Sequence, residues 1–247
     1  MKSKLLSATF WLTAWAIAAH VVGIELILPS PGAVGRTFLI LASESRFWLT
    51  AGYSLGRVLA GFTAGVVIGT ALAILTSVSK IMDAILSPAI RIIRAAPVAS
   101  FIILILLWAT RASVPGIIAM LMVIPVVWGA LVTAIEATDS NLLEMASAYR
   151  FGRAKTLKLI YLPSVMPQFL SSCLTAQGLA WKSGIAAEVI CLPRLAAGTE
   201  IYHSRIYLET PALFVWTALV VILSLLLEKA FRLLLTAISR DKSIKTL

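Results

Sequence analysis

Residues 141–167 read NLLEMASAYRFGRAKTLKLIYLPSVMP, the one long polar and basic stretch in an otherwise apolar chain. The stretch lies between two apolar segments that are each long enough to cross a membrane. Its composition favours a helix, and the prolines at 163 and 167 predict where that helix ends. A helical loop that faces water inside a membrane protein is typical of a docking site for a soluble partner.

The composition places the whole chain in a membrane. Hydrophobic residues make up 60% of the 247 residues and charged residues 13%, with a mean hydropathy of +0.97. A soluble domain carries about 25% charged residues, so that class is excluded. A chain of this length holds about six spans of roughly 20 residues each. The sequence therefore predicts an all-α polytopic membrane protein with a single transmembrane domain over 1–247.

Apolar runs and helix breakers define six expected spans. Pro31 and Gly32 break the chain after the first span, and Ser87-Pro88 and Ala96-Pro97 interrupt the approach to the third. The first run is too long for a signal peptide and lacks a clear cleavage site, which predicts an uncleaved span. The expected spans are 6–27, 52–76, 96–110 with a lead-in from 84, 114–135, 165–190 and 211–234.

The basic residues predict the orientation in the membrane. Fourteen of the 21 lysines and arginines fall in segments on the same side as both termini, and five fall on the opposite side. Cytoplasmic loops carry the excess of positive charge, so both termini and the loop over 139–163 are expected in the cytoplasm. This distribution explains the net charge of +10 without a nucleic-acid partner.

The 139–163 loop has the local signals of a helix that binds a groove. Asn141 is expected to cap the helix, with Glu144 three residues later in a capping box and Asp139 adding negative charge near the helix start. An apolar side is expected from Leu142, Leu143, Ala146 and Tyr149. Such a helix suits insertion into a groove on a partner.

The loop resembles the one by which permease subunits of bacterial ABC importers dock onto their ATPase. That pattern reads Glu-Ala-Ala, three residues, Gly, nine residues, Ile, one residue, Leu-Pro. Glu144, Ala146, Ile160, Leu162 and Pro163 match it in register. The resemblance implies a coupling loop (residues 139–163) in which contact with the ATPase involves Glu144, Ala146, Tyr149, Arg150, Gly152, Ile160, Leu162 and Pro163.

The pattern departs from the family at two positions. Met145 stands at the first alanine, and Arg150 stands at the glycine that would allow a sharp turn. Gly152 follows two residues later, and glycine adopts positive φ freely. We therefore expect Gly152 to take over the turn.

The resemblance extends beyond the loop. LPSPGAV (28–34), SLGRVLAGF (54–62), RAAPVASFIILILLW (94–108) and GLAWKSGIAAEVI (178–190) are similar to permeases of the nitrate, sulfonate and taurine branch. This implies a type I importer fold, a second copy of the chain, ABC ATPase subunits that bind ATP and Mg, and an extracytoplasmic binding protein. It also implies a small anion as substrate, or alternatively a vitamin or pyrimidine precursor. No cofactor is expected in this chain, which lacks a Gly-x4-Gly-Lys-Ser/Thr loop.

Among the charged residues within the expected spans, Arg57, Lys182 and Glu188 are candidates for the substrate path. Charge inside a membrane normally faces a bundle interior or a cavity. Arg57 and Lys182 could attract an anion, or Glu188 could neutralise one of them as a fixed pair between helices. Lys182 and Glu188 are six apart on one helix and do not face each other. Trp181 could line the path or pack at an interface.

An intramembrane enzyme is the alternative from a second class of function. Lys182, Glu188 or His203 would be its candidate residues, but no nucleophile turn or oxyanion site accompanies them. No metal-ligand cluster is predicted. Cys173 and Cys191 would lie about 27 Å apart on one helix, too far for a disulfide.

Overall fold

The structure is a computed structural model that describes the backbone of residues 2–244 and the side chains of residues 6, 7 and 9–233. Residues 1 and 245–247, which complete the expected domain of 1–247, lie outside the described residues. The described elements are helical: α1 Lys2–Val22, α2 Pro31–Ser43, α3 Ser45–Val78, α4 Lys80–Ala95, α5 Val98–Leu106, α6 Val114–Glu136, α7 Ser140–Ala148, α8 Arg153–Thr156, the π-helix η1 Leu157–Tyr161, α9 Leu162–Cys191, α10 Ala197–Ile206 and α11 Thr210–Ile244.

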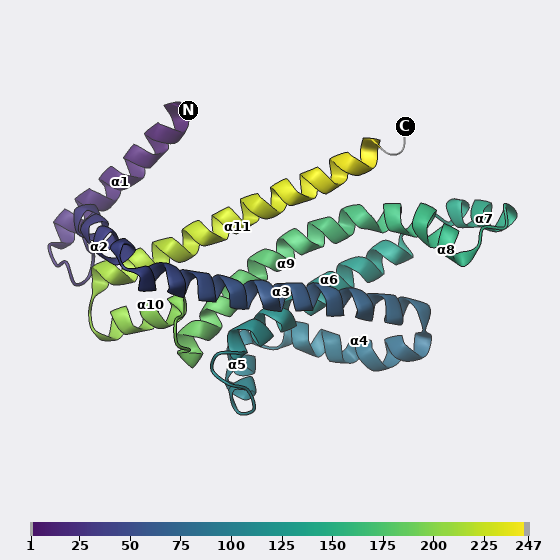
Figure 1. Cartoon of the computed structure of the whole chain (residues 1–247), viewed down its shortest axis with the longest axis horizontal. Helices are drawn as coiled ribbons and strands as arrows, with labels where there is room; N and C mark the ends of the chain where they lie inside the picture. Colours follow the sequence, from purple (N-terminus) through teal and green to yellow (C-terminus); the bar gives the residue numbers. More distant parts are fainter. Residues whose placement is uncertain (1, 245–247) are drawn as a thin grey trace.

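The helices form an elongated bundle with two distinct ends (Figure 1). One end, called the coupling end here, carries α7 and α8, and the C-terminal end of α11 points the same way. The opposite end, called the α10 end, carries α2 and α10. Helices α3, α6 and α9 pack together at the centre, and α1 diverges from the bundle beyond α2 (Figure 1).

Four described helices are long and apolar enough to cross a membrane: Ser45–Val78, Val114–Glu136, Arg153–Cys191 and Thr210–Leu233. The bent pair of α4 and α5 would make a fifth span. The apolar part of α1, Thr9–Val22, is shorter than a full span, and Gly23 ends the helix with a φ of +64°. The all-helical membrane fold is confirmed, and the count of six spans stays a prediction.

The expected third span is broken. Helices α4 and α5 meet at an angle of 106°, because Ala96 and Pro97 are both extended, with ψ of 143° and 131°. Proline lacks an N–H and disfavours helical backbone in the residue before it. By contrast, Pro88 lies inside α4, so the predicted interruption at Ser87-Pro88 is wrong.

Glycines in α3 explain how closely the central helices approach. A Cβ on Gly65 would lie 2.6 Å from the Val123 Cβ of α6, and one on Gly69 would lie 3.0 Å from the Ile124 carbonyl oxygen. A Cβ on Gly52 or Gly56 would meet nothing within 4 Å. The small residues in the middle of α3 therefore serve packing inside the chain, whereas the two near its start lie on an open face.

A continuous helical rod runs from the coupling end to the α10 end. Helices α8, η1 and α9 together cover Arg153–Cys191, 39 residues. The predicted helix end at Pro163 is wrong, because the π-turn that precedes the proline shifts the hydrogen bonding: the Leu162 N–H donates to the Leu157 carbonyl. The Ser164 hydroxyl donates to the Ile160 carbonyl at 2.8 Å, which satisfies an oxygen near the proline.

Candidate coupling loop and transport path

Helix α7, the first part of the coupling loop, begins two residues earlier than expected. Asp139 is its N-cap, and the Asp139 carboxylate accepts hydrogen bonds from the backbone N–H of Asn141 at 2.8 Å and from its side-chain amide at 3.0 Å. The predicted capping box of Asn141 and Glu144 is therefore wrong, because Asp139 already satisfies the free N–H near the helix start. Glu144 is exposed and has no capping role.

Helix α7 ends in a Schellman motif centred on Arg150. The Phe151 N–H donates to the Ala146 carbonyl at 2.8 Å, and the Arg150 N–H donates to Ser147 at 2.9 Å. Arg150 itself adopts the left-handed conformation, with φ of +53°. Gly152 has φ of −69° and ψ of 157°, so the prediction that Gly152 takes over the turn is wrong.

The residues of the coupling motif divide between the core and the surface. Ala146 and Ile160 are 3% and 4% exposed and hold the loop against the protein. The predicted apolar side is only partly correct, since Tyr149 is 74% exposed. Glu144 and Arg150 are also exposed, as are Leu162 and Pro163 where α9 begins. The surface that a partner can reach therefore includes Glu144 of α7 and the residues Tyr149 and Arg150 that follow the helix.

The connection between α7 and α8 is fixed by a cation–aromatic contact. The Lys155 ammonium lies 3.9 Å from the centre of the Phe151 ring, an arrangement that stabilises both groups. The Tyr149 and Phe151 rings lie 6.4 Å apart. The turn therefore has a defined shape although most of its residues are exposed.

At the α10 end, Glu188 of α9 is fully buried in a polar cluster. Its carboxylate accepts hydrogen bonds from the Ser54 hydroxyl at 2.8 Å and from the Gly198 N–H at 3.1 Å. Arg57 Nη1 lies 3.3 Å from the other carboxylate oxygen. Ser54 in turn accepts from the Ala197 N–H at 2.9 Å. Helices α3, α9 and α10 therefore meet at one carboxylate.

The fixed-pair interpretation is confirmed for Arg57 and wrong for Lys182. Arg57 also donates to the carbonyls of Leu195 at 3.0 Å and Arg194 at 2.8 Å, which leaves little of its side chain exposed. Lys182 is exposed and forms no ion pair with any described residue. Among the candidate path residues, Lys182 is thus the cation whose charge is open to a ligand.

Trp181 belongs to the core of this chain. Its side chain is 2% exposed and its indole N–H donates to the Val220 carbonyl of α11 at 3.1 Å. Glu188 is likewise closed to solvent. Neither residue lines a path within the described chain, so the packing interpretation holds for Trp181.

Lys182 continues a polar strip along the exposed face of α9. The strip has the spacing of one helix face and consists of Gln168, Ser171, Thr175, Gly178 and Lys182. Four of these residues are exposed, and a Cβ on Gly178 would meet nothing within 4 Å. The neighbouring face of the same helix carries the core residues Cys173, Ala176 and Ala180. The sequence analysis missed this strip, although its spacing was visible in the sequence.

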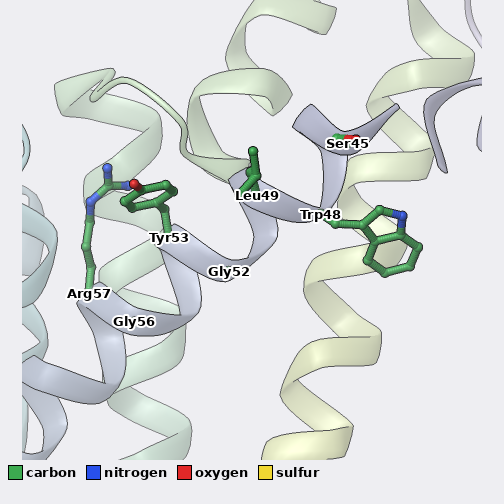
Figure 2. Close-up of a pocket in the computed structure, with 7 residues that line it drawn as sticks. All are labelled: Ser45, Trp48, Leu49, Gly52, Tyr53, Gly56 and Arg57. Atoms are coloured by element: carbon green, nitrogen blue, oxygen red, sulfur yellow. The ribbon is translucent and has the colours of Figure 1, made fainter. Parts of the chain in front are cut away.

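An open groove runs along the first turns of α3 (Figure 2). Its volume is about 750 Å³, and Gly52 and Gly56 leave its floor without side chains. Arg57 reaches the edge of the groove, where its guanidinium lies 5.8 Å from the centre of the Tyr53 ring. Trp48 points away from Arg57 at the other end of the groove (Figure 2).

Comparison with known proteins agrees with this geometry. Residues 65–242 match the family described as "Binding-protein-dependent transport system inner membrane component". The taurine transport system permease protein TauC of Escherichia coli is 26% identical over 233 residues, which are 92% of this chain and 83% of that protein. The bicarbonate transport system permease protein CmpB of Synechococcus elongatus is 30% identical over 64% of this chain and 57% of that protein.

A solved structure shares the fold. The crystal structure of an amino acid ABC transporter with histidines superposes with a TM-score of 0.61 at 17% identity, covering 76% of this chain and 90% of that chain. The family match covers most of the chain and includes the coupling loop and α9 with Glu188, whereas Ser54 and Arg57 lie before the matched residues. The chain therefore belongs to the inner membrane components of binding-protein-dependent transport systems, in the branch of ABC importer permeases that includes the taurine and bicarbonate proteins.

Proposed function

We propose that this permease carries a small oxyanion and that Lys182 attracts it within the membrane. The observation that carries the proposal is the exposed ammonium of Lys182 on the polar strip of α9, which forms no ion pair with any described residue. A charge within a span normally faces a water-filled path or a partner charge, and the Glu188 carboxylate is already occupied by Arg57. Relatives named for taurine and bicarbonate transport point to the same class of substrate. A sulfonate, taurine or nitrate fits this proposal.

The path requires a second copy of the chain. The polar strip lies on the outside of the single chain, where contact with lipid would be costly for Lys182 and unfavourable for Gln168. A homodimer with the two strips facing each other would enclose them in water. In this arrangement, residues 1–247 form one domain and one half of the transport unit.

The coupling loop supplies the contact with ABC ATPase subunits, which bind ATP and Mg and hydrolyse the nucleotide. Glu144 of α7 and the following residues Tyr149 and Arg150 are exposed, and such a surface is of the type that a groove on a soluble partner accepts. The excess of basic residues on this side supports a cytoplasmic position for the loop and both termini. An extracytoplasmic binding protein then delivers the substrate at the α10 end.

Uptake measurements on the Lys182→Met variant test the substrate proposal. Cells that contain the complete transport system are given labelled taurine, nitrate or bicarbonate, and separately a neutral pyrimidine precursor. We expect uptake of one anion to fall about ten-fold or more, the loss that corresponds to 1.4 kcal/mol, with normal amounts of the complex in the membrane. Thr175→Val, a change of similar shape on the same strip that removes a hydroxyl but no charge, is the matched control. Uptake of only the neutral compound, unchanged by Lys182→Met, would exclude the anion path.

A further inference from the structure

The short connection between α9 and α10 is held in an unfavourable backbone shape. Leu192 and Leu195, both within it, have φ of +51° and +50°. A left-handed conformation is uncommon for residues with a side chain and persists where the surrounding contacts enforce it. Here the Arg57 guanidinium binds the carbonyls of Arg194 and Leu195, and the Thr199 hydroxyl donates to the Pro193 carbonyl at 2.8 Å.

Glu188 joins the first turn of α10 to this connection through hydrogen bonds. The N–H of Gly198 donates to Glu188 directly, and the N–H of Ala197 reaches it through the Ser54 hydroxyl. A Cβ on Gly198 would lie 2.5 Å from the Glu188 Cβ and 2.7 Å from the Val189 nitrogen. The start of α10 therefore rests directly on the backbone of α9, with no room to slide.

The same helix reaches the coupling loop at its other end. The rod Arg153–Cys191 has 39 residues, which at the rise of an α-helix is a length of about 57 Å. Its first residues belong to the coupling loop, and Glu188 lies in its last turn. If the rod moves as one body, a displacement at the coupling end therefore also moves Glu188. Glu188 in turn moves the first turn of α10, to which it is hydrogen-bonded.

We propose that Glu188 is a positioning residue that makes α10 and the end of α9 one rigid unit. Through this unit, a movement of the coupling loop reaches the surface of the protein on the opposite side of the membrane. The proposal rests on the proposed function, because it assumes that an ATPase moves the coupling loop. Arg57 and Ser54 belong to the same unit, since each holds both Glu188 and the chain beside it.

A purely structural role for Glu188 predicts a different behaviour from a transmitting role. If the cluster only stabilised the fold, its loss would lower the stability and the amount of the protein, and the remaining transporters would work normally. If the cluster transmits movement, a variant that still folds would hydrolyse ATP and fail to transport. Glu188→Gln keeps the shape of the side chain and one acceptor oxygen, so it separates these two cases.

The experiment measures the distance between spin labels at Ile190 and His203 in the complex with its ATPase, without nucleotide and with ATP. Both positions are exposed, and the buried Cys173 and Cys191 are replaced by alanine. With Glu188 in place we expect one narrow distance that ATP leaves unchanged. In Glu188→Gln we expect a broadened distance and a loss of uptake of about five-fold or more, the lower end of allosteric coupling, with ATP hydrolysis retained.

Two further variants complete the test. Ser54→Ala removes the link to Ala197 without touching the charge pair and should reproduce the broadening if Glu188→Gln fails to assemble. Arg46→Gln is the matched control, because the Arg46–Glu200 pair also joins α3 to α10 but is exposed and is worth little. A narrow distance in both cluster variants, or broadening with normal uptake, overturns the proposal. Failure of the unaltered complex to take up anions contradicts the proposed substrate and leaves the distance test valid.

Discussion

The turn at the end of α7 offers the sharpest test of the local physical chemistry. Arg150 occupies the left-handed region with φ of +53°, where glycine pays no steric penalty. Replacing it by glycine removes a strain of about 1–2 kcal/mol. Glycine also has more conformational freedom when the turn is open, and this reduces the stabilisation of the closed turn by about 0.4–1 kcal/mol. The net expectation is that Arg150→Gly stabilises the closed turn by roughly 1 kcal/mol, a factor of about five in its opening equilibrium.

Amide hydrogen exchange at the turn measures this equilibrium directly. The Phe151 N–H is bonded to the Ala146 carbonyl at 2.8 Å, so it exchanges only when the Schellman motif opens. In the full-length protein in detergent, Arg150→Gly should slow exchange of the peptide that contains Phe151 by about five-fold. Arg150→Val should accelerate it, because a β-branched residue tolerates this region worst.

A glycine nearby provides the matched control. Gly152 is extended, and a Cβ there would meet nothing within 4 Å. Gly152→Val should therefore leave exchange of Phe151 unchanged and should not impair assembly, contrary to what the sequence alone suggests. Faster exchange in Arg150→Gly, or disruption by Gly152→Val, would refute the assignment of the turn to Arg150.

Three other outcomes follow from the contacts. Arg57→Met leaves the buried Glu188 charge without its partner, which should cost about 3–5 kcal/mol and lower the melting temperature in detergent by roughly 6–20 °C. The double variant Arg57→Met/Glu188→Gln should recover part of this loss of stability. Losses that simply add in the double variant would contradict the pair. Gly198→Ala should destabilise by about 1–3 kcal/mol through its contacts with α9, whereas Gly178→Ala on the open strip should not, as thermal unfolding will show. Glu144→Lys should abolish ATP-dependent uptake at normal membrane levels, and normal uptake would contradict docking by α7.

Much of the architecture was predictable because it depends on composition and on local rules. The apolar runs predicted the positions of α3, α6, α9 and α11, and the proline at 97 predicted a break. The composition of residues 141–148 predicted a short helix, which is α7, and the coupling role of the loop stays a prediction. Local rules were insufficient where a nearby residue competed for the same role. Asp139 is the N-cap in place of Asn141, because its carboxylate accepts a hydrogen bond from the backbone N–H two residues later, that of Asn141 itself.

The prolines show where local rules fail. Pro97 ends a helix, but Pro88 and Pro163 lie within helical segments. A proline removes one hydrogen bond, and the loss is tolerated where packing against neighbouring helices favours a continuous helix. In the case of Pro163, the π-turn before it relocates the free carbonyls. The sequence contains the proline, and the surrounding bundle decides whether the helix stops.

For the charged residues within the expected spans, too, the sequence determined one part of the result and the tertiary structure the other. The sequence by itself determined that the chain spans a membrane and that Arg57, Lys182 and Glu188 need an environment other than lipid. It also predicted that a basic loop faces a soluble partner. Only the tertiary structure decided that Glu188 pairs with Arg57 and that Lys182 forms no ion pair with a described residue. The physical reason is that residues 131 positions apart in the chain meet only through the packing of α3 against α9. Spacing along one helix fixes which face a side chain occupies, and the neighbouring helices determine what that face contacts.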